Sequence, residues 1–217
     1  MAIAFDAATG SNGSSVSSLT WSHTTSSGSN RILFVSVAEW DSTKKVTGVT
    51  YAGVSMTEID SQQVAASNPW ITLYYLVAPA TGANNVVVSA SGSMFQIQGS
   101  SASYTGVSQT GIPDSKNKSA YSSSTTQAIS TTVVASNCWL FMGVVNDSSD
   151  GITAGTGTTR RDIRASAEAV FDSNGTVGTG SQSLTFVTPA GGHEGAVIIS
   201  FKPVAPVTGN GFFALVR

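Results

Sequence analysis

The feature that most constrains the fold is a long succession of short segments with strand character, separated by turn residues. The segments are rich in Val, Ile, Thr and aromatic residues, which suit a pleated sheet, and Gly, Pro, Asn, Asp and Ser fill the gaps between them. The predicted strands are Ser18–Thr24, Arg31–Trp40, Val46–Tyr51, Val54–Ile59, Trp70–Ala78, Asn85–Ser91, Phe95–Tyr104, Gln127–Val134, Cys138–Asn146, Thr158–Ala165, Glu168–Phe171, Ser183–Thr188 and Gly195–Lys202. Such a series without alternating helices favours a sandwich or barrel over a parallel α/β sheet.

Three apolar runs are candidates for the core, because a continuously apolar strand should be covered on both faces. They are Arg31–Val37, Cys138–Val145 and Gly195–Phe201. The segment Arg161–Phe171 fits a helix or a strand, and the alternation that starts at Ala167 favours a strand. The predicted fold is therefore all-β, an antiparallel two-sheet β-sandwich of jelly-roll type.

Composition excludes some classes of partner. Charged residues make up 10% of the chain, Lys and Arg together number 10, and the net charge is −2, whereas a typical globular domain has about 25% charged residues. Without clustered cations to bind phosphates, no nucleic-acid partner is expected, and no apolar run of about 18 residues predicts a membrane span. The segment Met1–Asp6 lacks the features of a signal peptide, which predicts that the chain is made in a cytoplasm and stays there or leaves by another route. Virion assembly followed by lysis of the host is one such route. A secreted chain trimmed of its leader, located outside the cell or on its surface, is the alternative.

The polar stretch Asp114–Gln127 is typical of an exposed loop, and the composition changes again near the C-terminus. A single sandwich domain is predicted over residues 1–203, followed by an extended arm over residues 204–217. The arm ends in an apolar segment that either folds back as a strand or docks on a neighbouring subunit. For docking, the expected assembly contacts are Phe212, Phe213, Leu215 and Val216.

Two internal similarities bear on whether the chain has one core or two. Ser29–Val37 aligns with Ser136–Val144, 107 residues further on, and Tyr51–Thr57 aligns with Tyr104–Thr110 at a different spacing. Two similar half-units would produce such similarities. Two core strands of one sandwich that meet the same packing demands would also produce them, so both explanations stay open.

No catalytic residue is predicted. Only His23 and His193 could act as the base of a hydrolytic triad, and no motif places a third group beside either of them. His23 shares a strand face with Leu19 and Trp21 and is expected to pack there, while His193 lies in a glycine-rich turn. The single cysteine, Cys138, is expected to be a small buried side chain.

Carboxylates could support two other kinds of chemistry. Pairs at i,i+2 spacing, expected on one strand face, could hydrolyse glycosides, although charges at a strand edge or rim are the preferred explanation. These pairs are Glu39 with Asp41 and Glu58 with Asp60. The loops 147–150 and 172–175 are rich in oxygen ligands that calcium prefers, yet local turn formation accounts for them. No metal and no cofactor is therefore predicted.

Aromatic residues could form a platform on which a sugar stacks. The aromatic residues considered are Trp40, Trp70, Tyr74, Tyr75 and Tyr121, and the candidate platform is Trp40, Trp70 and Tyr74. Core and rim positions in a sandwich are the preferred explanation for these residues. Tyr75 must point to the opposite face from Tyr74, because side chains alternate along a strand. Trp21 and Trp139 are expected in the core.

Three stretches together carry a resemblance to a known kind of module. Val46–Thr57, Leu73–Gly92 and Ser103–Thr110 follow one pattern of strands and hairpins. The pattern resembles a poorly characterised β-sandwich module of phage virion proteins and bacterial surface proteins, over about residues 16–202. The resemblance implies a fold and a structural or adhesive setting, and it implies no catalytic residue.

These observations lead to a function hypothesis with alternatives. We expect a non-enzymatic structural accessory of a phage virion, such as a capsid decoration, head-fibre or tail-associated protein, that contacts capsid or tail proteins and copies of itself. The alternative is a carbohydrate-binding or adhesion module that recognises a surface glycan. A glycan hydrolase that uses one of the acid pairs is the third hypothesis.

Overall fold

A computed structural model describes residues 1–64, 69–122, 125–148, 151–165, 167–188 and 192–206. All regular elements in this part of the chain are β-strands, and every pair is antiparallel. The strands are β1 (Ala4–Thr25), β2 (Ile32–Trp40), β3 (Val46–Tyr51), β4 (Val54–Ser55), β5 (Thr57–Gln63), β6 (Trp70–Val77), β7 (Gly82–Thr105), β8 (Ser115–Ser122), β9 (Thr126–Val133), β10 (Trp139–Asn146), β11 (Thr153–Ala154), β12 (Thr159–Arg164), β13 (Glu168–Asp172), β14 (Gly180–Val187) and β15 (His193–Phe201). The predicted all-β sandwich is confirmed. Among the described residues, no helix is long and apolar enough to cross a membrane.

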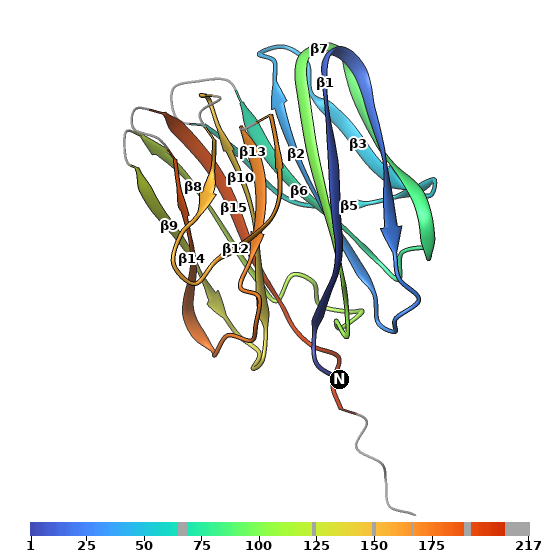
Figure 1. Cartoon of the computed structure of the whole chain (residues 1–217), viewed down its shortest axis with the longest axis vertical. Helices are drawn as coiled ribbons and strands as arrows, with labels where there is room; N and C mark the ends of the chain where they lie inside the picture. Colours follow the sequence, from blue (N-terminus) through green and yellow to red (C-terminus); the bar gives the residue numbers. More distant parts are fainter. Residues whose placement is uncertain (65–68, 123–124, 149–150, 166, 189–191, 207–217) are drawn as a thin grey trace, which may run out of the picture.

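The first half of the chain forms one curled sheet (Figure 1). Its strand order is β4-β3-β7-β2-β6-β5, and β1 pairs along the other edge of β7. Strands β1 and β7 are long and bend, so that one end of β7 pairs with β3 and the other end with β2. The bend curls the sheet around its own apolar contents.

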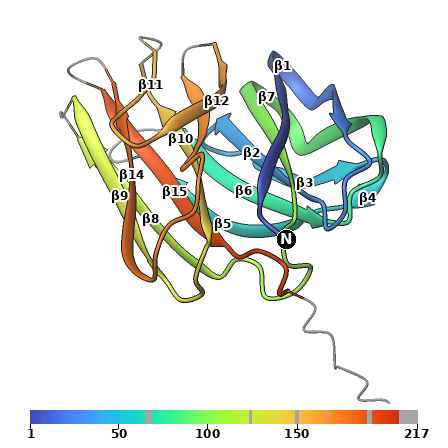
Figure 2. The same ribbon diagram turned by 60° about the horizontal axis from the view of Figure 1, so that its bottom comes forward.

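The second half forms two sheets instead of one. A central sheet has the order β12-β13-β10-β15-β8, and an outer sheet has the order β11-β14-β9. Figure 2 shows the central sheet lying between the outer sheet and the sheet of the first half. The described residues therefore form three hydrogen-bonded sheets, and the central one is covered on both faces.

Three apolar clusters fill the spaces between these layers. One lies inside the curled sheet and includes Leu33, Val35 and Tyr51. Another lies within the second half, and a third joins the halves around Phe34 and Phe141. All three predicted core strands are confirmed, because β2, β10 and β15 are buried almost throughout. The prediction of one domain over residues 1–203 stays a prediction, since the joining cluster is as substantial as the other two.

Several strand boundaries differ from those predicted. The predicted strands Asn85–Ser91 and Phe95–Tyr104 are parts of the single strand β7, and β1 begins well before Ser18. The predicted loop Asp114–Gln127 contains β8, which is an edge strand. Edge strands carry the Lys, Ser and Asn side chains that are also typical of loops, so the composition was misleading there. Within the segment Arg161–Phe171, the described residues 161–164 and 168–171 are strand, as predicted, and Ala165 and Ala167 lie in a turn.

Candidate functional site

Strand register brings acidic and aromatic side chains onto one face of the curled sheet. Glu39 at the end of β2 is the cross-strand partner of Trp70, and Glu58 in β5 is the partner of Tyr74. Directly opposite residues share a face of the sheet. These side chains line a pocket of about 230 Å³, which is completed by Lys45, Val46, Ser61 and Thr72. We call it the Trp70 pocket.

One wall of the Trp70 pocket is fixed by charge. The Lys45 ammonium lies 3.1 Å from Oε1 of Glu39, and the Val46 backbone N–H donates to Oε2 at 2.7 Å. The same ammonium lies 4.1 Å from the centre of the Trp70 ring, a geometry typical of a cation–π contact. Glu39 is therefore held in place between strands, and one face of Trp70 is covered by a flexible side chain.

The other wall presents polar groups without partners. Within the described part of the chain, the Glu58 carboxylate, the Trp70 indole N–H and the Tyr74 hydroxyl make no hydrogen bond to protein. Burial, followed by the nearby charges of Glu58 and Glu39, raises the pKa of Tyr74 well above its ordinary value. The Tyr74 hydroxyl thus keeps its proton and can donate. The pocket offers two donors and one charged acceptor to a ligand.

Not all of the predicted platform and acid pairs meet in this pocket. Trp40 packs on the opposite face of β2, against the cluster that joins the halves, because it follows Glu39 in the strand. The prediction that Glu58 and Asp60 share a face is wrong, since a β-bulge between them reverses the alternation. Asp60 instead forms ion pairs with Lys116 and Lys118.

The pair of Glu39 and Asp41 also fails to form. Strand β2 ends at Trp40, and Asp41 lies in the following turn. Its carboxylate accepts the backbone N–H groups of Thr43 and Lys44, and these bonds hold its pKa well below the ordinary value. The register instead places Glu39 beside Trp70 and Glu58 beside Tyr74, on either side of β6, so that both glutamates line the Trp70 pocket, a combination that spacing along the chain could not reveal.

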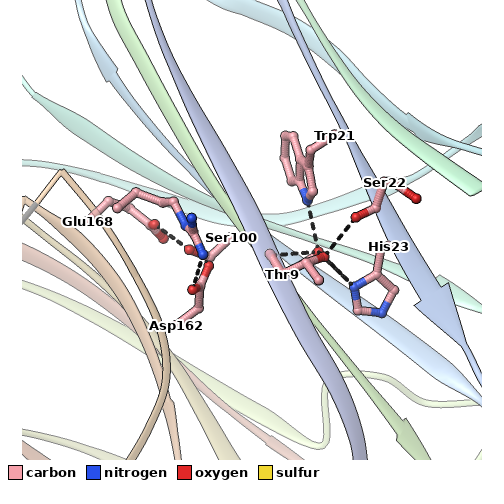
Figure 3. Close-up of polar contacts among 9 residues, drawn as sticks. Thr9, Trp21, Ser22, His23, Ser100, Asp162 and Glu168 are labelled. Atoms are coloured by element: carbon pink, nitrogen blue, oxygen red, sulfur yellow. Dashed lines mark hydrogen bonds and ion pairs between the residues drawn. The ribbon is translucent and has the colours of Figure 1, made fainter.

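His23 is at the centre of a separate, enclosed network (Figure 3). Its Nδ1 lies 2.9 Å from the hydroxyls of both Thr9 and Ser101, and its Nε2 lies 3.0 Å from that of Ser103. Ser103 in turn donates to Asp6 at 2.8 Å. The ring is fully buried, and burial lowers the pKa of His23 to about 4. Both ring nitrogens are engaged, so the network ties the two arms of β1 to β7 and offers no exposed nucleophile.

The remaining predicted candidates serve local structure. His193 Nδ1 lies 2.9 Å from the Asp147 carboxylate, and Asp172 accepts from Arg161 and Tyr104. Residues 149–150 of the first candidate calcium loop lie outside the described residues. Across the part of the chain that is described, no three His, Cys, Asp or Glu side chains gather closely enough to hold a metal ion. Cys138 is buried and free, as predicted.

A buried acid between the halves was not found from the sequence. Glu168 begins β13 and is fully buried, and Ser100 of the first half donates to its Oε2 at 2.6 Å (Figure 3). Its other oxygen has no partner in the structure. Burial raises the pKa of Glu168 to about 8. A glutamate at the start of an apolar run was the one available signal.

The two ends of the described chain frame an apolar hollow. It has a volume of about 310 Å³ and is lined mainly by Met1–Ile3 and by Pro203, Val204 and Pro206. The Val204 backbone N–H donates to Gly106 at 2.9 Å, which fixes the start of the arm. The predicted assembly contacts lie outside the described residues; they are Phe212, Phe213, Leu215 and Val216.

Comparison with known proteins adds no relative. No protein-family model, curated protein or solved structure matches this chain. The resemblance to a β-sandwich module of phage virion and bacterial surface proteins therefore stays a prediction, and the geometry of the sites has to carry the functional argument.

Proposed function

We propose that the protein is a non-enzymatic carbohydrate-binding module of a virion or bacterial surface, and that the Trp70 pocket is its binding site. The observation that carries the proposal is the convergence of Trp70, Tyr74 and Glu58 with unpaired polar atoms around one concave site. Binding sites commonly combine aromatic walls with a few polar groups that fix orientation. A sugar hydroxyl both donates and accepts, so it can bond to Glu58 and to Tyr74 together.

The contacts of the two glutamates in the pocket, Glu39 and Glu58, support binding without catalysis. A glycoside hydrolase needs two carboxyl groups with separate roles. In the Trp70 pocket, Glu39 is occupied by Lys45 and by the Val46 N–H. Glu58 therefore has no free second carboxylate to act with, which favours binding over hydrolysis.

A glycan array probed with the labelled full chain tests this function. We expect binding of a defined set of surface glycans that falls at least tenfold for Trp70→Ala and for Glu58→Gln. Phe95→Ala is the matched control, because Phe95 is 72% exposed and lies outside the pocket. Equal binding by the wild type, the pocket variants and the control would refute the proposal.

The apolar hollow at the chain ends favours a second function, that of a structural accessory of a phage virion. In this proposal the apolar arm of one copy docks in the hollow of another, and the assembly contacts capsid or tail proteins. The arm begins beside the hollow, and its sequence contains Phe212, Phe213, Leu215 and Val216. Symmetric exchange of terminal segments is a common route to oligomers.

Light scattering on the full chain and on a chain that ends at Pro206 tests the second function. This shorter chain keeps every residue that lines the hollow. We expect a defined oligomer that dissociates on truncation and on Phe213→Asp. A monomer at every concentration would rule out self-association through the arm.

A further inference from the structure

The two halves of the chain have the same pattern of strand pairing. In each half, a central strand pairs with one strand on each side. The long strands β1 and β7 bend within the one sheet of the first half, whereas their counterparts in the second half are broken into the pairs β8–β15 and β9–β14, which lie in two sheets. The correspondence runs β1 to β8 with β9, β2 to β10, β3 to β11, β5 to β12, β6 to β13, and β7 to β14 with β15. Every pairing among the corresponding strands of the first half has a counterpart in the second.

The agreement extends to register and to an irregularity. Ile32 pairs with Tyr104, and in the second half Trp139 pairs with Phe201. A β-bulge interrupts β5 between Glu58 and Asp60, and another interrupts β12 between Arg160 and Asp162. Each bulge falls at the same step relative to the neighbouring strand. Bulges are specific local features, so their coincidence is strong evidence of a common plan.

Corresponding side chains also make the same hydrogen bonds. Asp6 accepts from the Ser103 hydroxyl at 2.8 Å and from the Ser26 N–H at 2.9 Å. Asp114 accepts from the Ser200 hydroxyl at 3.1 Å and from the Val134 N–H at 2.9 Å. The aspartate, the serine and the residue that donates its backbone N–H each occupy corresponding positions in the two halves. The same Asp–Ser hydrogen bond therefore recurs in the second half.

One further hydrogen bond and one backbone conformation repeat in the two halves. The Thr9 hydroxyl donates to the Ser22 carbonyl at 3.1 Å, and the Asn117 amide donates to the Ser130 carbonyl at 2.8 Å. The asparagines that precede β2 and β10 both have positive φ, 55° for Asn30 and 58° for Asn137. Residues other than glycine seldom adopt this conformation. Packing demands on two core strands do not explain these repeats outside the core.

The halves meet through corresponding surfaces. Phe34 and Phe141 stack at 5.1 Å. Phe34 also contacts Phe201 at 5.0 Å, and Phe141 contacts Tyr104, the counterpart of Phe201, at 6.3 Å. The contact between Phe34 and Phe201 is thus repeated by their counterparts, Phe141 and Tyr104. An interface whose contacts are repeated by the counterpart residues has the two-fold form of a homodimer interface.

Against this similarity, the Trp70 pocket is a point of difference. The residues that line it have different counterparts in the second half. Tyr74 corresponds to Phe171, Glu58 to Arg160, Glu39 to Asn146, Thr72 to Ala169 and Ser61 to Ile163. Phe171, Ala169 and Ile152 pack together there in the apolar cluster, and Arg160 bonds to the Ile152 carbonyl at 2.7 Å.

We infer that the chain is two fused copies of one β-sandwich unit, and that the Trp70 pocket is a ligand site opened in the first copy alone. The fold does not need Tyr74, Thr72 or Glu58 there, because the second copy has the same strands without them. One chain therefore offers one site. The inference that the Trp70 pocket binds a ligand rests on the proposed carbohydrate-binding function, whereas the inference that the unit is duplicated does not.

Reciprocal exchange at corresponding positions tests the inference by thermal unfolding without any ligand. Tyr74→Phe removes a hydroxyl that has no protein partner, so we expect a change in Tm of less than about 2 °C. Phe171→Tyr places a hydroxyl in an apolar cluster and should lower Tm by about 5 °C. Thr72→Ala and Ala169→Thr form a second pair with the same expectation, should Phe171→Tyr fail to fold.

Two results would overturn the inference. A loss for Tyr74→Phe as large as that for Phe171→Tyr would mean that the pocket residues serve the fold. Tolerance of both Phe171→Tyr and Ala169→Thr would mean that the second copy has an open site too. Neither result depends on a sugar, so a failed glycan screen and a failed exchange remain distinguishable.

Discussion

Glu168 is the residue whose substitution should change stability most clearly with pH. Its side chain is fully buried between the halves, and its one hydrogen bond comes from Ser100. Asp162 adds repulsion that Arg164 partly offsets. Burial of the charged form without a full set of partners is unfavourable, so the folded protein keeps this carboxyl group protonated near neutral pH. Glu168→Gln replaces it with a neutral side chain of the same shape.

The size of the effect follows from two pKa values. The pKa of Glu168 is raised from 4.5 to about 8, so the folded state holds a proton that the unfolded chain has released. Stability therefore falls as pH rises between these values. At about 1.4 kcal/mol per pH unit, the full loss is roughly 5 kcal/mol. His23 opposes it at lower pH, because a pKa lowered from 6.5 to about 4 makes stability rise with pH over that range.

In the wild type, the slope from His23 offsets the slope from Glu168 between pH 4.5 and 6.5, so the loss of stability due to Glu168 is clearest in the wild type between pH 6.5 and 8. Across it, the wild type should lose about 2 kcal/mol relative to Glu168→Gln. His23 and Glu194, whose pKa values burial also shifts, are present in both proteins, so their effects cancel in the difference.

Urea unfolding followed by circular dichroism at both ends of this window measures the difference. Glu58→Gln is the matched control, because it makes the same chemical change at an exposed position. If Glu168→Gln runs parallel to the wild type across the window, the carboxyl group is not held protonated by burial and the reasoning fails.

Three further predictions concern the core. In NMR titrations, the His23 ring should stay neutral until about pH 4, and a midpoint near the ordinary value would mean that the network opens. Phe34→Ala and Phe141→Ala should each cost about 3–5 kcal/mol in urea unfolding, and a large inequality would contradict the two-fold packing of these rings. Cys138 is fully buried, and burial raises the pKa of its thiol to about 12. Thiol reagents should therefore label it only in urea, and rapid labelling of the folded protein would show that the strand end opens.

The strand class and the core were predictable from local pattern. A fully buried strand must be apolar on both faces, so β2, β10 and β15 could be recognised from their own residues. Opposite orientations of Tyr74 and Tyr75 followed from alternation. These features depend on neighbours along the chain, which the sequence displays directly.

The candidate site depended on neighbours across strands, and the sequence does not display them. The bulge at Ile59 turned Asp60 away from Glu58, and the register of β6 set Glu58 against Tyr74. A shift of one residue moves a side chain to the other face. The position of Trp40, in contrast, follows from local alternation, because Trp40 comes directly after Glu39 in β2 and therefore lies on the other face.

The similarity between the halves explains why the two internal sequence similarities did not decide between one core and two. Ser29–Val37 and Ser136–Val144 correspond strand for strand, whereas Tyr51 and Tyr104 lie in strands that do not correspond. The structural counterpart of Asp6 in the second half is Asp114. The sequence could not reveal this correspondence, because Asp114 is an isolated aspartate in a polar stretch. Hydrogen-bond geometry is retained where side-chain identity has changed.

Charge placement links the fold to the proposed site. In a chain with so few charged residues, Asp60, Lys116 and Lys118 lie between the halves, and Arg161 crosses from β12 to cover the Phe5 ring. These contacts hold the two units in one orientation. Glu39, Lys45 and Glu58 make no such contact between the halves. Glu39 and Lys45 pair with each other and fix one wall of the Trp70 pocket, whereas Glu58 makes no ion pair among the described residues. A fixed wall that faces one unpaired carboxylate is the arrangement that a preorganised binding site requires.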